Sequence, residues 1–342
     1  MRYRRVGRTG MLVSELCLGT NTFGGDGPVW KSLGALEQPA VDAVVAKAVE
    51  GGINFIDTAD MYAAGQSEEC VGRAIRNVGV DRADVVIATK VGGRMAPGVN
   101  GTGASRGHMI RALDASLKRL ATDYVDLYMV HYFDPATPLE ETLRTLDGLV
   151  RAGKVRHIGC SNFAAWQVMK GLQVSAREGL ERFEVIEANW SAATRGLERE
   201  VVPMALDQGV GVLVWGGLVG GLLSGKFNRE GGDAGVSRTG GNTPPVLNRD
   251  QVFDVVDALR TVAARREASV AQTALAWLLS HKAVTSVLFG ARNAEQVADN
   301  VKATDVVLQD DDMALIGAAA EPVMDYGLWS VRGSATARLQ YV

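Results

Sequence analysis

The chain has 342 residues, and its 36 Lys and Arg against 39 Asp and Glu give a net charge of −3. With 47% apolar residues it has enough material for a large core, and no run of clustered basic residues indicates nucleic-acid binding. No apolar run reaches the roughly 18 residues of a membrane span. Ser14 and Glu15 interrupt the early apolar stretch, which argues against a secretory signal.

Three cysteines, Cys17, Cys70 and Cys160, lie far apart in apolar settings. Their number and spacing predict neither a disulfide framework nor a metal site, so we expect a cytoplasmic protein without a metal. The length is compatible with two domains or with one α/β barrel, and no linker of distinct composition divides the sequence. We therefore predict a single domain over residues 1–342.

Short β-branched runs alternate along the chain with segments of helical periodicity. The predicted strands are residues 16–18, 54–57, 85–89, 125–131, 155–159, 185–188, 211–215 and 286–289. The predicted helices are residues 40–51, 67–77, 105–120, 138–152, 163–171, 197–209, 268–281 and 294–303.

Eight βα units favour closure into a (β/α)8 TIM barrel over an open sheet. The turn at residues 19–24 also lacks the G-x-G-x-x-G pattern of a Rossmann fold. Residues 220–226 match part of a phosphate-binding loop, but Phe227 stands where that loop needs Ser or Thr. Long loops at 20–39, 91–104 and 226–249 follow strands, so we expect them to surround a pocket at the C-terminal face of the barrel.

Polar side chains end three successive predicted strands: Asp57, Lys90 and His131, with Tyr62 in the loop just after Asp57. Alone, Asp57 could cap a helix, Lys90 could be solvated and His131 could be a core imidazole. Together at one barrel mouth they form an acid–base set. In this interpretation Asp57 holds Lys90 charged, Lys90 lowers the pKa of the Tyr62 phenol, and His131 hydrogen-bonds a carbonyl oxygen that Tyr62 protonates.

The sequence resembles the aldo-keto reductases over nearly its whole length, within the branch that includes potassium-channel β subunits and bacterial sugar or aldehyde reductases. The matching motifs are Gly19-Thr20 with residues 13–18 before it, then residues 55–62, 67–72, 88–90, 126–134, 148–163 and 290–296, and Asn300. The resemblance implies a barrel with residues 1–15 as a hairpin across its bottom. It also implies Asp57, Tyr62, Lys90 and His131 as a catalytic tetrad, with NADP(H) bound in an extended pose.

The resemblance further implies that Ser161 and Asn162 grip the nicotinamide carboxamide, while residues 215–226 wrap the pyrophosphate. The residues implied to bind the cofactor are Gly19, Thr20, Asp57, Ser161, Asn162, Glu187, Trp190, Trp215, Gly216, Gly217, Leu218, Lys226, Gly290, Arg292, Gln296 and Asn300.

Three positions depart from the family pattern. Glu187 replaces a carboxamide-binding Gln, Trp190 replaces a Tyr expected to stack under the nicotinamide, and Gly216 and Gly217 replace Ser and Pro. A carboxylate accepts a hydrogen bond but donates one only when protonated, so Glu187 changes the grip on the carboxamide. Loss of the Ser hydroxyl removes one phosphate contact, which glycine backbone N–H groups can replace.

The sequence thus predicts an oxidoreductase that reduces an aldehyde or ketone, such as a sugar or aromatic carbonyl, with NADPH, and Tyr62 as the general acid. Phe23, Trp30, Tyr62 and His131 are predicted to contact the substrate, with Trp190, Tyr326 and Trp329 as further walls. NADH is a possible reductant in place of NADPH. The alternatives are an NAD-dependent sugar or alcohol dehydrogenase and a cofactor-sensing regulatory subunit. A small-molecule partner is expected, without nucleic acid or membrane, and homo-oligomer formation stays open.

Overall fold

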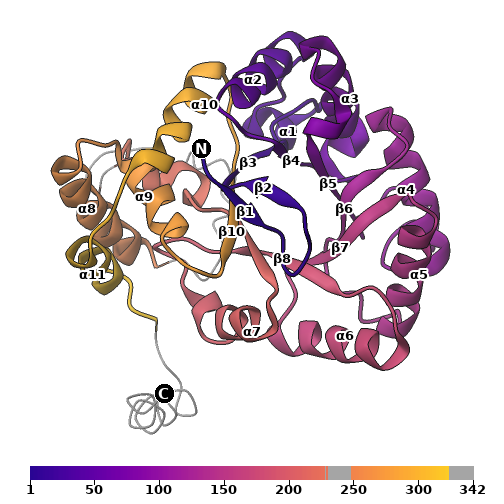
Figure 1. The fold of residues 1–342 in the computed structure, drawn as a ribbon. Helices are drawn as coiled ribbons and strands as arrows, with labels where there is room; N and C mark the ends of the chain where they lie inside the picture. Colours follow the sequence, from indigo (N-terminus) through magenta and orange to yellow (C-terminus); the bar gives the residue numbers. More distant parts are fainter. Residues whose placement is uncertain (228, 230–247, 323–342) are drawn as a thin grey trace, which may run out of the picture.

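Eight parallel strands close into a barrel in this computed structural model, which describes residues 1–227, 229 and 248–322 (Figure 1). The strands pair in chain order, and β10 closes the barrel by pairing with β3 and β9. They are β3 (Leu16–Gly19), β4 (Phe55–Asp57), β5 (Val86–Val91), β6 (Val125–Val130), β7 (Val155–Ser161), β8 (Phe183–Asn189), β9 (Gly211–Trp215) and β10 (Val284–Phe289).

Helices surround this barrel (Figure 1). They are α1 (Pro28–Leu33), α2 (Gln38–Glu50), α3 (Gln66–Val78), α4 (Arg106–Leu120), α5 (Leu139–Arg151), α6 (Ala165–Glu178), α7 (Val201–Gln208), α8 (Arg249–Arg265), α9 (Val270–Leu279), α10 (Ala294–Val301) and α11 (Asp310–Ala318). Short 3-10 segments are η1 (Tyr62–Gly65), η2 (Arg82–Asp84), η3 (Gly196–Glu198), η4 (Val219–Ser224) and η5 (Lys302–Asp305). None of the helices in the described part of the chain combines the length and apolarity needed to cross a bilayer.

The strands are buried on both faces, as in barrels whose outer face is covered by helices. Every residue of β5 and of β10 is buried, for example. Their outward side chains pack against the helices in one large core, while a smaller core fills the barrel interior. The hairpin of β1 (Tyr3–Arg5) and β2 (Leu12–Ser14) crosses one end of the barrel (Figure 1), and Val6 and Val13 join that interior core. The hairpin leaves the opposite end of the barrel uncovered (Figure 1).

The predicted TIM barrel and its N-terminal hairpin are confirmed, and all eight predicted strands lie within two residues of the observed ones. Three helices, α1, α8 and α11, were not predicted. The predicted helix at 197–209 is instead η3 followed by α7, which starts at Val201. The strand register matters most for the site, because it aligns Gly19 with Asp57, Lys90 with Met129 and Ser161 with Glu187 at one rim.

Candidate active site

Tyr62 is turned into the barrel mouth by an unusual backbone. Ala63 and Ala64 have φ values of 49° and 54°, and Gly65 follows at 95°, so three successive residues are left-handed. Each non-glycine residue in this region costs about 1–2 kcal/mol. Strain of this kind persists where the surroundings fix the segment. Here Ser67, at the start of α3, fixes the end of the segment because its hydroxyl donates a hydrogen bond to the Thr20 carbonyl at 2.8 Å.

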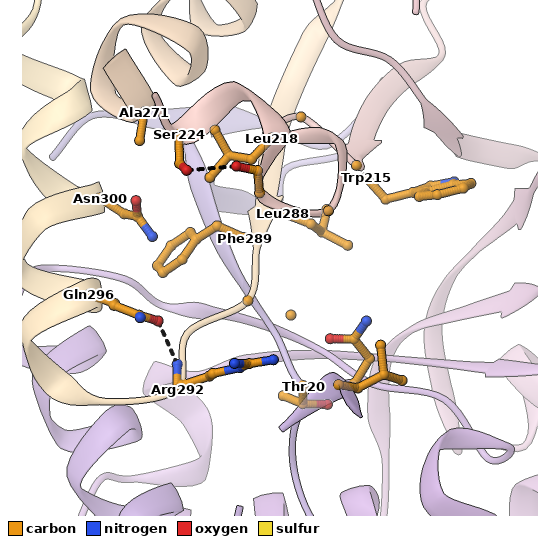
Figure 2. A pocket seen from close by; sticks show the side chains of 18 of the residues that line it. Thr20, Trp215, Leu218, Ser224, Ala271, Leu288, Phe289, Arg292, Gln296 and Asn300 are labelled. Atoms are coloured by element: carbon orange, nitrogen blue, oxygen red, sulfur yellow. Dashed lines mark hydrogen bonds between the residues drawn. The ribbon is translucent and has the colours of Figure 1, made fainter. Parts of the chain in front are cut away.

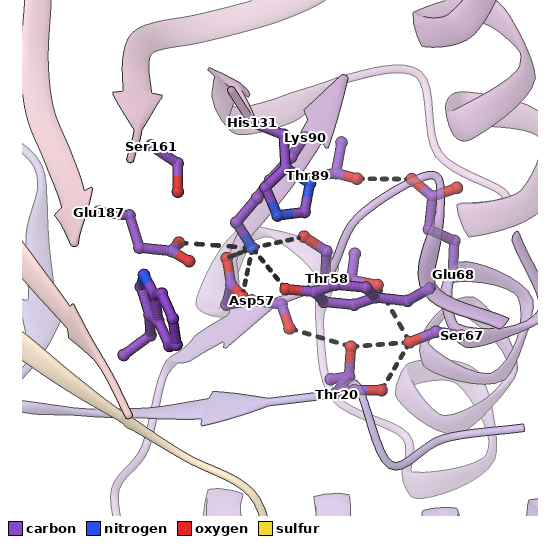
Figure 3. A network of polar contacts seen from close by, with 12 residues as sticks. Thr20, Asp57, Thr58, Ser67, Glu68, Thr89, Lys90, His131, Ser161 and Glu187 are labelled. Atoms are coloured by element: carbon purple, nitrogen blue, oxygen red, sulfur yellow. Dashed lines mark hydrogen bonds and ion pairs between the residues drawn. The ribbon is translucent and has the colours of Figure 1, made fainter. Parts of the chain in front are cut away.

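Lys90 is the centre of a group that we call the Lys90 cluster: the buried Asp57, Lys90 and Glu187 (Figure 3) together with the half-buried Tyr62. Its ammonium donates to both Asp57 oxygens, at 2.7 and 2.6 Å, and to the Thr58 carbonyl at 3.0 Å. The Tyr62 hydroxyl lies 3.3 Å from Nζ, and Glu187 Oε2 lies 3.4 Å from it. One ammonium therefore bridges two carboxyl groups and a phenol.

Charge in this cluster is governed by burial and by the contacts of Lys90. Burial opposes charging of Lys90, but Asp57 and Glu187 outweigh it and raise its pKa well above the ordinary value. Burial also raises the pKa of Tyr62, and the lowering effect of Lys90 is smaller. The sequence predicted the sign of the Lys90 effect but not this net result. Tyr62 therefore keeps its proton at neutral pH, as a proton donor requires.

His131 follows β6 and faces the same mouth, where its ring meets Tyr62 edge-on at 5.8 Å between centroids. It also stacks on Tyr132, at 4.5 Å and nearly parallel. Burial, with the positive charge of Lys90, lowers the pKa of His131 to about 3. The imidazole is therefore neutral in solution near pH 7 and can donate one N–H to a bound oxygen.

A long cavity of about 1170 Å³ opens beside the Lys90 cluster. Figure 2 shows its walls, from Asn300, Gln296 and Arg292 at one end, past Phe289 and Leu288, to Trp215 at the other. Asp57, Tyr62, His131 and Glu187 line it near Trp215. The cavity thus leads from the α10 helix to the strand ends that carry the titratable groups.

Glycine backbones form one wall of this cavity, after β9. Gly216 has a φ of +76°, and a Cβ there would lie 2.3 Å from the Asn189 amide nitrogen. A Cβ on Gly217 would lie 2.7 Å from Leu278. A Ser at position 216 would need a strained left-handed backbone and would displace the Asn189 amide, and a Pro at position 217 would require the end of the Leu278 side chain to move. The glycines bring bare peptide groups to the cavity.

A model of the Aldo/keto reductase family matches residues 15–321. The chain belongs to this family. It is 34% identical over 324 residues to the uncharacterised oxidoreductase YrpG of Bacillus subtilis, covering 92% of this chain and 95% of the relative. It is 36% identical to a probable voltage-gated potassium channel subunit beta of Oryza sativa, over 90% of this chain and 92% of the relative. Versiconal hemiacetal acetate reductase of Aspergillus parasiticus is 32% identical, covering 92% and 95%.

Most residues that the sequence marked for the cofactor line the cavity of this aldo/keto reductase. They are Gly19, Thr20, Asp57, Asn162, Glu187, Trp215, Gly216, Gly217, Leu218, Lys226, Gly290, Arg292, Gln296 and Asn300. Lys90 and Ser161 are completely buried behind this wall. Ser161 reaches the cavity through Asn162, whose amide donates to the Ser161 hydroxyl at 3.0 Å.

Trp190 lies elsewhere, which contradicts the predicted stacking on the nicotinamide. Its indole is fully buried outside the cavity, packed against Trp277 and His281, and its Nε1 donates to Glu198 at 3.0 Å. Trp215 is the tryptophan that lines the cavity, with 38% of its surface exposed and its Nε1 bonded to Asn162. The tryptophan on the cavity wall therefore comes from the end of β9 and not from the residue after β8.

The predicted substrate walls also need correction. Phe23 is fully buried in the outer core, and Trp30 is half-buried; neither lines the cavity. Tyr326 and Trp329 lie outside the described residues. Tyr132 was not predicted, although it directly follows His131, and it takes a place on the wall with about half of its surface exposed. Asn21, Lys31, Ser32 and Leu33 come from the predicted 20–39 loop, Ser224 comes from the predicted 215–226 segment, and Phe227 comes from the predicted 226–249 loop. Further wall residues that sequence reasoning missed are Ser269, Ala271, Leu288, Phe289, Asn293, Glu295 and Asp299.

Proposed function

We propose that this aldo/keto reductase uses NADPH to reduce an aldehyde or ketone, with Tyr62 as the proton donor. The observation that carries the proposal is the Lys90 cluster at the mouth of a long cavity. A substrate oxygen within reach of both Tyr62 and His131 would accept two hydrogen bonds, which polarise the carbonyl and align it with the phenol.

Each residue has a separate task in this mechanism. Tyr62 transfers the proton of its hydroxyl to the substrate oxygen. Lys90, 3.3 Å away, stabilises the phenolate that results, and Asp57 holds the ammonium charged through two short contacts. His131 is neutral, so its N–H positions the oxygen without competing as an acid. The nicotinamide supplies the hydride when bound.

The cavity suits a nicotinamide dinucleotide in several ways. Its volume is larger than that of most small-molecule sites, which is about 300–1000 Å³. Trp215 offers a flat face near Tyr62, and Asn162 an amide beside it. Gly216 and Gly217 let phosphate groups approach the backbone closely. Gln296, bonded to the backbone N–H of Arg292, and Asn300 suit the adenosine end.

Arg292 supports NADPH over NADH. Its guanidinium donates to the Ser32 carbonyl at 2.8 Å across the cavity, so it is fixed beside the expected adenosine ribose. A guanidinium binds a phosphate bidentately, which the ribose hydroxyl of NADH cannot match. Lys31 lies on the same wall, whereas Glu295 and Asp299 oppose an anion there. Asp299 accepts a hydrogen bond from Gln272 at 2.7 Å, which weakens the repulsion between Asp299 and a bound phosphate.

The substrate side favours flat apolar carbonyl compounds. Tyr132 and Trp215 flank the mouth, and both present aromatic surface beside His131. Such surfaces bind aromatic rings and the apolar faces of sugars. Three relatives of the chain are named as reductases of versiconal hemiacetal acetate or norsolorinic acid, which accords with carbonyl reduction.

The test is a panel of aromatic aldehydes, ketones and sugars with NADPH, followed by nicotinamide absorbance. We expect turnover by the wild type and a loss of about 10²–10⁴-fold in kcat for Tyr62→Phe, because general acid catalysis contributes that much. The dissociation constant for NADPH should stay unchanged, since the ring retains its shape. Retention of more than about a tenth of kcat in Tyr62→Phe would contradict the assignment of the acid.

Similarity to channel β subunits favours a second candidate, a cofactor-sensing regulatory subunit. In that case both cofactor forms would bind, and no carbonyl in the panel would turn over at a useful rate. The NAD-dependent dehydrogenase alternative predicts oxidation of alcohols with NAD⁺ instead. Running the panel in both directions with both cofactors separates the three.

A further inference from the structure

Glu187 is the one member of the Lys90 cluster without a task in the proposed mechanism. It lies at the end of β8, is almost completely buried, and yet lines the cavity beside Asp57 and Tyr62. Its Oε2 makes no hydrogen bond within the described part of the chain, and its contact with Lys90 is long, at 3.4 Å. Glu187 Oε2 is thus held at the cavity by a long contact with Lys90, and the Glu187 side chain also hydrogen-bonds that of Asp57.

The charges in this region do not balance if both acids are ionised. Titratable groups face Glu187 from four elements: Cys17 on β3, Asp57 on β4, Lys90 on β5 and Tyr62 on η1. Lys90 is the one cation among them. Two carboxylates and one ammonium would leave an uncompensated negative charge on side chains that are almost completely buried, which is costly.

One acid therefore holds a proton, and the geometry identifies it. Asp57 binds the Lys90 ammonium through both oxygens, at 2.7 and 2.6 Å, so it is the ionised partner. Burial, followed by the neighbouring Asp57 carboxylate, raises the pKa of Glu187 well above its ordinary value. The pKa of His131 is lowered to about 3, so its imidazole is already neutral near pH 7. His131 therefore cannot be the group that holds the extra proton.

We propose that Glu187 is a proton site linked to the redox state of the bound cofactor: it keeps its proton beside a neutral nicotinamide ring and releases it to solvent beside a cationic one. This rests on the proposed function, because it requires the ring to lie near Tyr62 and Trp215. The oxidised ring supplies the positive charge that compensates a second carboxylate, while the reduced ring is neutral. Glu187 therefore favours NADP⁺ increasingly as pH rises.

Two quantities follow for binding. Wild-type protein should release up to one proton more per NADP⁺ bound than per NADPH bound. In the pH range where Glu187 is protonated in the cofactor-free protein, we expect a change in the ratio of the dissociation constant for NADP⁺ to that for NADPH. This ratio should fall about tenfold for each unit by which the pH rises. The phosphate groups of the cofactor titrate in both forms, so their contribution cancels in this ratio.

The experiment is isothermal titration with NADP⁺ and with NADPH in two buffers of different ionisation enthalpy, from about pH 6 to about pH 9, which bracket neutrality. The comparison includes Glu187→Gln, which keeps the shape but cannot ionise, and is expected to release the same number of protons with NADP⁺ as with NADPH. Asp60→Asn is the matched control. Asp60 is also a buried acid, with a pKa raised to about 7 mainly by burial, but it does not line the cavity. It should keep the wild-type release.

Tyr62→Phe identifies the origin of the proton, and we expect it to retain the release. Loss of release in Tyr62→Phe would assign the proton to the phenol and overturn the inference. A persistent difference in proton release between NADP⁺ and NADPH in Glu187→Gln, or equal release with the two cofactors in the wild type, would overturn it as well. If neither cofactor binds the wild type, the proposed function fails and the inference fails with it.

Discussion

Replacement of Lys90 by Met removes the only cation from a buried group of carboxyls. The Lys90 side chain is fully buried and that of Asp57 is 2% exposed, so water cannot replace the lost ion pair. Breaking a buried pair by removing one partner costs about 3–5 kcal/mol. For a chain of this length, about 4 kcal/mol corresponds to a decrease of about 6 °C in Tm.

The cost should depend on pH in a defined direction. Burial already raises the pKa values of Asp57 and Glu187 above those of the unfolded chain, and loss of Lys90 raises them further because its lowering effect is removed. The folded state then binds more protons than the unfolded state, so stability falls as pH rises above about 4 and until the folded-state pKa is reached. Each carboxyl contributes up to about 1.4 kcal/mol per pH unit within this window.

The assay is urea and thermal denaturation of cofactor-free wild type, Lys90→Met and the double variant Lys90→Met/Asp57→Asn, at about pH 5 and about pH 8, on either side of neutrality. We expect the single variant to lose more stability at the higher pH, and the double variant to recover part of it there. Lys170→Met, an exposed lysine on α6, is the control and should change stability by less than about 0.5 kcal/mol.

Two results would refute this reasoning. One is a Lys90→Met variant within about 1 kcal/mol of the wild type at the higher pH, which would mean that Asp57 finds another partner or water. The other is a double variant no more stable than the single one, because the penalty would then not come from the unpaired carboxylate.

Two further predictions concern the cavity walls. NADP⁺ should quench the fluorescence of wild type and of Trp190→Phe, whereas Trp215→Phe should lose most of the quenching, because Trp215 lines the cavity and Trp190 is buried outside it. Equal quenching in all three proteins would point to another tryptophan. Arg292→Ala should lower kcat/KM for NADPH about tenfold and leave that for NADH nearly unchanged, since a charge-assisted hydrogen bond contributes about 1.5–3 kcal/mol. An equal loss with both cofactors would contradict a 2′-phosphate contact.

The site shows why some sequence predictions were accurate and others were not. Asp57, Lys90 and His131 end successive strands, and parallel strands in a barrel carry their C-terminal ends to one rim. Their proximity therefore follows from the order of elements. Trp190 directly follows β8 and Trp215 is the last residue of β9. Successive residues of a strand face opposite sides, so a shift of one position decides between the mouth and the outer core. Only the registered barrel distinguishes them.

The sequence by itself determined the alternation of eight strands and helices, the barrel class, and which polar side chains gather at its mouth, because these depend on periodicity and chain order. Three features were decided by the tertiary structure alone. Tyr62 stays protonated although Lys90 lowers its pKa, because burial raises that pKa more. Glu187 joins the Lys90 cluster with its Oε2 outside any hydrogen bond in the described part of the chain, and the Asn189 amide lies where a Cβ at position 216 would be. The reason is that desolvation and close packing depend on which distant segments exclude water from a given atom, and no local pattern records that.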